Sequence, residues 1–193
     1  DTVKHVEPEF MAKFCNAIHE YCERIGKKNF IIFGELIGDD AFLHKYIGNN
    51  GPAQGTNEWF PRFDALLDFP LYVVLDEVVK GTGSCADLRR RYEHFRQHYR
   101  DVSEAAGYYV TFVDNHDQMH RPYRRFMAGV QNWRIGVQAI AYLMTNIGMP
   151  CIYSGTEQGF DGAGDSDWYI REAMFGGTWG AFDTTGMHFF NPD

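Results

Sequence analysis

The sequence has no long uninterrupted apolar run. Charged or polar residues break every apolar stretch of the 193-residue chain, whereas a membrane-spanning helix needs about 20 consecutive apolar residues. We therefore expect no membrane span. A signal peptide is not visible either. Because the chain begins at Asp1 and not at a methionine, its first residues carry no information on targeting.

The sequence also has fewer basic than acidic residues. The chain has 18 lysines and arginines against 26 acidic residues, a formal charge of −8. Since contact with phosphates requires a basic surface, this balance argues against a nucleic-acid-binding protein and suits a neutral substrate such as a sugar. The run Arg89–Arg91, with aromatic residues after it, is interpreted as the solvated side of a helix with an apolar back.

Two familiar site motifs are absent. The four cysteines do not have metal-site spacing, and Cys15 and Cys22 lie about 10 Å apart along one predicted helix, beyond disulfide reach. We expect them to be buried thiols. The Gly81–Ser84 turn lacks the lysine of a phosphate-binding loop.

Apolar segments typical of strands alternate with segments of helical periodicity. Residues 1–6 are predicted to be the end of a strand that begins upstream, and the further predicted strands are 29–33, 65–72, 108–113 and 151–153. The predicted helices are 8–25, 73–80, 86–99 and 133–144. This order predicts a parallel sheet in an α/β fold. Five strands are too few to close an eight-stranded barrel, so we expect residues 1–193 to be the C-terminal portion of one (β/α)8 (TIM-type) barrel domain.

The first predicted helix has a regular apolar face. Pro8 suits its first turn, and Gly26 suits its C-terminal end. Between them, large apolar residues recur at helical spacing and form one face: Phe10, Phe14, Ile18, Tyr21 and Ile25.

The strand at 108–113 ends abruptly in four polar residues, Asp114 to Asp117. In barrel enzymes the strands form a dry core and the chemistry lies at their carboxyl ends. Asp1, Glu35 and Asp117 each fall at the carboxyl end of a predicted strand. Glycoside cleavage requires converging carboxylates, one as nucleophile and one as general acid and base. A separation of roughly 5 Å between the carboxylates of the first two would predict retention of anomeric configuration.

The three acids, and the histidines at 116 and 120, also allow other interpretations. Each acid taken singly suits a surface position or a helix cap. His116, Asp117 and His120 suggest a metal site, since two of them are histidines four residues apart. That spacing requires a helix, whereas the preceding residues are typical of a strand, and no third strong ligand is evident nearby. A catalytic metal is therefore disfavoured.

Five segments, in the right order along the chain, resemble the α-amylase family (glycoside hydrolase family 13). Asp1–His5 (DTVKH), Phe33–Glu35 (FGE) and Phe112–Asp117 (FVDNHD) are similar to its second, third and fourth conserved blocks. Gly148–Glu157 is similar to the last-strand block, and Leu67–Leu71 to the strand between the third and fourth blocks. The resemblance places the chain at roughly the fourth to eighth strands of the family's barrel.

The resemblance also implies roles for individual residues. Asp1 would be the nucleophile, Glu35 the general acid and base, and Asp117 the acid that holds sugar hydroxyls and stabilises the transition state. His116 would bind sugar beside Asp117. Lys4 and His5 would contact acceptor-side sugars.

The family often binds a structural calcium ion through the backbone carbonyl at the His5 position. Most of its other ligands would lie in N-terminal elements that this sequence lacks. Trp59 and Tyr153 are candidates for stacking on sugars, with core packing an equal alternative for each.

The function that the resemblance implies is retaining hydrolysis of α-1,4-glucosidic bonds in starch or glycogen. A cyclodextrin glucanotransferase-like transferase and a non-catalytic amylase-like binding domain are the alternatives. The resemblance further implies an α-glucan partner, a monomeric full-length protein and an extracellular or periplasmic location. The first family block, the arginine before the nucleophile and the inserted domain are absent, so we expect this segment alone to be unstable and inactive.

Overall fold

A computed structural model of the chain describes residues 3–47, 63–117, 120–121, 124–162, 166–171 and 174. The chain divides into two compact units, and each is described by itself. The first unit consists of residues 1–70, 90–111 and 147–149, and the second unit consists of residues 71–89, 112–146 and 150–193.

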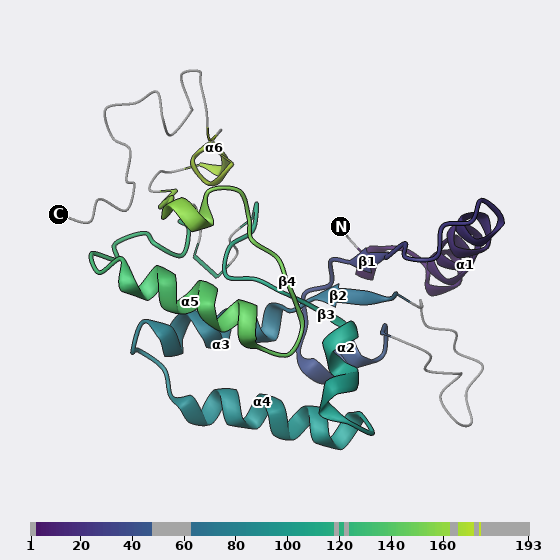
Figure 1. The fold of residues 1–193 in the computed structure, drawn as a ribbon, viewed down its shortest axis with the longest axis horizontal. Coiled ribbons are helices and arrows are strands. Elements are labelled where there is room, and N and C mark those ends of the chain that lie inside the picture. The colour runs from purple at the N-terminus through teal and green to yellow at the C-terminus, as the bar shows by residue number, and fades with distance from the viewer. Residues whose placement is uncertain are drawn as a thin grey trace. The chain divides into compact units, whose positions relative to one another are not determined.

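A parallel sheet forms the centre of the first unit (Figure 1). Its strands follow one another in chain order: β1 (Phe33–Gly34), β2 (Ala65–Leu67), β3 (Tyr109–Thr111) and β4 (Met149–Pro150). Phe33 is opposite Ala65, and Leu66 is opposite Tyr109, both in parallel register. The prediction of a parallel sheet is therefore confirmed.

Helices separate the strands, as the alternating pattern predicted. The α-helices are α1 (Pro8–Arg24), α2 (Asp40–His44), α3 (Phe69–Val79), α4 (Cys85–His98), α5 (Arg134–Thr145) and α6 (Asp167–Ile170). The 3-10 helices are η1 (Val3–His5), η2 (Val102–Gly107) and η3 (Thr156–Gln158). Within the described ranges, none of the helices combines the length and apolar character needed to cross a bilayer.

Three predicted strands were placed wrongly. The second is Phe33–Gly34 and not 29–33, because residues 29–32 form no strand. Val3–His5 is a 3-10 helix in which the Val6 amide bonds to the Val3 carbonyl at 3.3 Å, and α1 follows too closely for a strand. The last strand is Met149–Pro150 and not 151–153. The reason is Gly148, where a Cβ would collide with the Thr111 side chain. The missing side chain lets the chain approach β3 at residue 149, before the apolar run begins.

The third predicted strand, 65–72, is shorter than expected. It ends at Leu67, and α3 begins at Phe69 with Pro70 in its first turn. Proline suits this position because the N–H groups in the first turn of a helix have no partner within the helix. The N–H that proline lacks is therefore not needed there. The apolar residues that follow therefore belong to the helix, which begins before residue 73.

The aromatic face of α1 does not pack on the core of the first unit. Phe10, Phe14 and Tyr21 are exposed, whereas Cys15 and Cys22 are buried, as expected of the thiols. The other two cysteines, Cys85 and Cys151, are exposed, so that expectation was wrong for them. The core contacts follow a second stripe of the helix, on which Met11 and Cys15 lie four residues apart. Position on the helix, rather than side-chain size, decides which face is covered. Gly26 ends this helix with φ of 76°, as predicted.

Arg91 was expected to be solvated and is instead buried in the first unit. Its NH2 donates to Asp68 Oδ1 at 2.6 Å, and its NH1 pairs with Asp40. The guanidinium also lies 5.0 Å from the centre of the Tyr109 ring. One arginine thus joins α4 to α2 and to the residue that follows β2.

The core of the second unit lies between α3 and α5, which run side by side in Figure 1. The buried apolar residues are Leu71, Leu75, Val79, Val113, Phe126, Met127, Ala139 and Leu143. Beside them Tyr72 of α3 stacks on Phe112, with ring centres 5.1 Å apart. This contact fixes the chain immediately before the polar turn at 114–117.

Three histidines of the first unit lie against one another. The ring centres of His94 and His98 are 3.9 Å apart, and those of His44 and His98 are 4.7 Å apart. Burial, followed by the neighbouring His98 and Arg91, lowers the pKa of His94 to about 4. The structure therefore holds His94 in its neutral form.

This cluster should make the first unit sensitive to acid. The folded-state pKa of His94 lies below its unfolded value of about 6.5, so between these values the unfolded chain binds more protons. The free energy of unfolding should fall as pH is lowered from about 6.5 to 4. His94→Gln should flatten that dependence in denaturant titrations over this range, and His5→Gln, at an exposed position, should not. An unchanged pH dependence in His94→Gln would contradict the assignment.

Candidate active site

Glu35 follows directly after β1 in the first unit and is half-buried. Gly34 before it is tightly packed, because a Cβ there would lie 2.9 Å from Leu66 Cδ2 and 3.0 Å from Val3 Cγ2. Val3, two residues after Asp1, is buried in the same core. The segment that follows Asp1 and the strand that precedes Glu35 are therefore neighbours.

The remaining predicted residues of the first unit are partly described. Lys4 and His5 lie in η1 and are exposed. Asp1 and Trp59 lie outside the described residues.

The turn after β3 belongs to the second unit and passes from buried to open positions within four residues. Asp114 and Asn115 are buried, and His116 and Asp117 are half-exposed. The Asp117 amide donates to Asn115 Oδ1 at 2.9 Å, a side-chain-to-backbone bond typical of tight turns. His116 Nε2 lies 3.6 Å from Asp117 Oδ1. The two residues predicted to bind sugar here are thus presented side by side.

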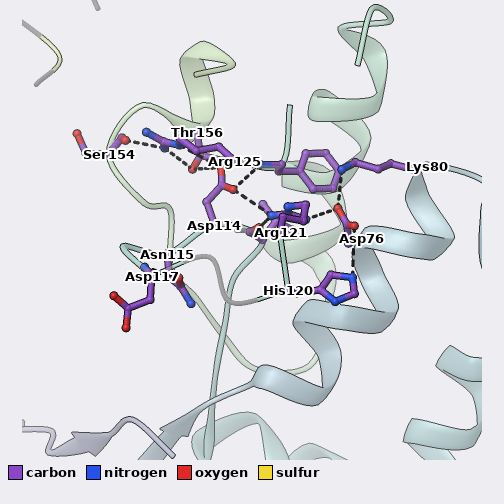
Figure 2. A network of polar contacts seen from close by, with 12 residues as sticks. Asp76, Lys80, Asp114, Asn115, Asp117, His120, Arg121, Arg125, Ser154 and Thr156 are labelled. Carbon is purple, nitrogen blue, oxygen red and sulfur yellow. Dashed lines mark hydrogen bonds and ion pairs between the residues drawn. The ribbon is translucent and has the colours of Figure 1, made fainter. Parts of the chain in front are cut away.

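The buried Asp114 carboxylate is the centre of a polar network in this unit (Figure 2). Its Oδ1 accepts from the Phe126 amide at 2.6 Å and from Arg121 NH2 at 3.2 Å. Its Oδ2 accepts from Thr156 Oγ1 at 3.0 Å and lies 3.6 Å from Arg125 Nε. The base of the turn is therefore tied to Arg121, to Arg125 and Phe126, and to η3.

Arg125 is fully buried and extends this network to the last predicted family block. Its NH2 donates to the Ser154 carbonyl at 2.7 Å and to Thr156 Oγ1 at 3.2 Å. Its guanidinium lies 4.7 Å from the centre of the Tyr153 ring. This contact favours the packing role of Tyr153 over the sugar-stacking role.

Arg121 extends the network to α3. Its NH2 donates to the Val113 carbonyl at 2.8 Å, and its NH1 pairs with Asp76. Asp76 also pairs with Lys80 at 2.7 Å. Burial lowers the pKa of Lys80 despite this partner, and burial raises the pKa of Tyr72 to about 12. The network is therefore poorly hydrated.

The described residues do not place His116 and His120 on one helix, as the paired-histidine metal site would require. The backbone at 114–117 is not helical, and His120 Nε2 lies 3.8 Å from Asp76 on α3. His120 belongs to no cluster of potential metal ligands in the described part of the chain.

A contact that sequence reasoning missed comes from Arg171, directly after α6. Its Nε donates to the His116 carbonyl at 3.0 Å, and its NH2 donates to Asp117 Oδ1 at 2.8 Å. Arg121 and Arg125 were missed as well. These side chains share no periodic pattern, so only the folded chain brings them to the turn.

Comparison with known proteins decides the family. Residues 4–176 match the family model described as "Alpha amylase, catalytic domain". The chain belongs to the α-amylase family.

The relatives within this family include amylases and transferases. The chain is 31% identical over 174 residues to a beta/alpha-amylase of Paenibacillus polymyxa, with 86% of this chain and 12% of the relative covered. It is 30% identical over 186 residues to an alpha-amylase of Streptomyces lividans, covering 91% and 18%. It is 29% identical over 214 residues to a cyclomaltodextrin glucanotransferase of Klebsiella oxytoca, covering 98% and 31%.

A solved structure supports the fold. The gamma-CGTase of alkalophilic Bacillus clarkii superposes with a TM-score of 0.58 at 22% identity, over 88% of this chain and 21% of that protein. The fold is therefore part of a (β/α)8 barrel of the α-amylase family, as predicted. The chain spans only 12% to 31% of the length of the three curated relatives named above.

The described residues do not by themselves form the calcium site that the family resemblance suggests. Calcium takes six to eight oxygen ligands, as a rule, and the residue carried over here offers one backbone carbonyl, that of His5. His5 belongs to no cluster of carboxylate, histidine or cysteine ligands within the described ranges.

Removing the Asp114 carboxylate should destabilise the protein strongly. Asp114→Ala would take the carboxylate partner from the buried Arg125 and one of two carboxylate partners from Arg121. Breaking a buried ion pair in this way costs about 3–5 kcal/mol. The measurement is the free energy of unfolding of the full-length protein in denaturant. Glu157→Ala, at an exposed position beside Thr156, should change it by at most about 0.5 kcal/mol. Equal effects of the two substitutions would contradict the structural role of the network.

Proposed function

We propose that the full-length protein containing this chain is a glycoside hydrolase that cleaves α-1,4-glucosidic bonds of starch- or glycogen-type glucans with retention of configuration. The observation that carries the proposal is the match of residues 4–176 to the α-amylase catalytic domain. The names of the relatives from Paenibacillus polymyxa and Streptomyces lividans agree with it.

In the proposed mechanism three acids act on one glucosyl ring. Asp1 attacks the anomeric carbon while Glu35 gives a proton to the leaving oxygen, which yields a covalent glycosyl-enzyme. Glu35 then takes a proton from water, which attacks the same carbon and releases the sugar with retained configuration. Asp117 binds sugar hydroxyls during both steps. The packing of Gly34 against Val3 supports this assignment, because it joins the two segments that carry Asp1 and Glu35.

Other residues are proposed to bind the glucan. Lys4 and His5 would contact the acceptor-side sugars, and both are exposed. His116 would bind the sugar held by Asp117, beside which it lies. A structural calcium at the His5 carbonyl, a monomeric full-length protein and an extracellular or periplasmic location complete the proposal by family resemblance.

A transferase of the same family is the second candidate. The observation that favours it is the similarity to cyclomaltodextrin glucanotransferases over nearly the whole chain. In that reaction a sugar hydroxyl, and not water, would resolve the glycosyl-enzyme. A non-catalytic amylase-like binding domain is the third candidate, and the presence of all three acids in the sequence disfavours it.

Glu35→Gln tests whether the protein is an enzyme. The amide cannot donate or accept the proton, so turnover of maltoheptaose in the full-length protein should fall by at least about 10²–10⁴-fold. Glucan binding, measured by calorimetry, should be retained. Glu23→Gln, on the exposed surface of α1, should match the wild type in both measurements. If Glu35→Gln leaves turnover unchanged, the acid and base assignment is wrong.

The products formed from maltoheptaose distinguish hydrolysis from transfer. We expect short linear sugars that retain the α configuration at the new reducing end, because water resolves a covalent intermediate. Chromatography and proton NMR early in the reaction measure both features. Longer or cyclic glucans as the main products would support the transferase instead.

A further inference from the structure

We propose that Arg171 is a positioning residue for Asp117. It fixes the backbone and the carboxylate of this acid, so that the acid meets the sugar hydroxyls in one orientation. The inference rests on the proposed function of Asp117, and it adds a residue that the conserved blocks of the sequence did not indicate.

The two hydrogen bonds from Arg171 reach two different parts of the turn. Nε holds the backbone through the His116 carbonyl at 3.0 Å, and NH2 holds the side chain through Asp117 Oδ1 at 2.8 Å. A guanidinium is planar, and its donors have a fixed separation. When both bonds form, the direction of the Asp117 carboxylate is therefore set relative to its own backbone.

Arg171 itself is held on a packed element of the second unit. Ile170 before it is fully buried. A Cβ placed on Gly162 would lie 2.8 Å from Ile170 Cγ2 and 2.8 Å from Arg125 Cγ, so these two side chains enclose the same glycine. Arg125 in turn contacts Asp114 at the base of the turn. The two ends of the turn at 114–117 are thus fixed to one packed region.

The contact leaves Asp117 open to a ligand. Among the described residues, the hydrogen bond to its carboxylate goes to Oδ1, so Oδ2 stays available to a sugar hydroxyl. The carboxylate points away from the buried network in Figure 2. The side chains of Arg171 and Asp117 are 47% and 39% exposed. An exposed ion pair contributes little to stability, so loss of position can be measured without loss of folding.

Substitution of Arg171 in the full-length protein tests the proposal. Arg171→Gln should lower kcat on maltoheptaose by about 10–100-fold, because a small misplacement of an active-site group has effects of this size. The melting temperature should not change. Arg171→Lys should restore part of the loss, since it keeps the charge but not the planar pair of donors. Arg124→Gln, at an exposed position of the same unit, is the control and should have no effect.

A double substitution separates positioning from an independent role. If Arg171 acts through Asp117, the combination of Arg171→Gln with Asp117→Asn should lose no more activity than Asp117→Asn alone. Additive losses would overturn the proposal, because Arg171 would then act elsewhere. A rise in kcat for Arg171→Gln would overturn it too, since Arg171 would then be blocking the acid.

Hydrogen exchange gives a readout that needs no activity. Amides of residues 112–117 should exchange faster in Arg171→Gln than in wild type or Arg124→Gln, and unchanged exchange would overturn the proposal. Glu35→Gln is measured in parallel. An inactive wild-type protein would refute the proposed function and with it the catalytic consequence of positioning, whereas the exchange result would still decide whether Arg171 holds the turn. An active protein that depends on Glu35 but not on Arg171 would refute positioning alone.

Discussion

The buried carboxylate of Asp114 is the interaction on which the candidate site depends. It lies where an apolar strand segment ends, and it is shared by two arginines, a threonine hydroxyl and a backbone amide. An isolated buried charge is very costly, and only several well-placed partners offset that cost. Those partners are Arg121, Arg125, Phe126 and Thr156 of η3, so the turn at 114–117 adopts its shape only when these residues are in place.

The turn at 114–117 is buried at its base and partly exposed at its tip, and the two acids at these ends have different roles. Asp114 is buried and hydrogen-bonded, whereas the side chain of Asp117, three residues later, points away from the network. Parallel strands end together at one edge of a sheet, and the residues just beyond them are the ones free to act on a ligand. A rigid inner acid allows an outer acid to be presented with little loss of conformational freedom when substrate binds.

The sequence indicated the α/β class, the parallel sheet, most helices and the family, because these depend on local composition and on contiguous motifs. It did not indicate the contacts of Arg91, Arg121, Arg125 or Arg171, since the residues next to an arginine do not show which distant segment it will contact. The sequence also did not indicate which face of α1 packs on the core. The aromatic residues form the most apolar face, but the core contacts come from the face that carries Cys15. The start of β4 depends on the missing side chain of Gly148, a contact with β3 that no single segment encodes.

Glycines and arginines hold segments of this chain together in two different ways. At Gly34 and Gly148 the absence of a Cβ lets segments approach more closely than any other residue would allow. At Arg91 a long planar cation bridges two carboxylates from different segments, and at Arg121 and Arg125 it contacts a backbone carbonyl and a carboxylate at once. Close approach builds the sheet of the first unit, and bridging by Arg121 and Arg125 fixes the turn at 114–117 within the second unit. A site assembled from residues far apart along the chain needs both, because the sheet alone does not orient the side chains that follow its strands.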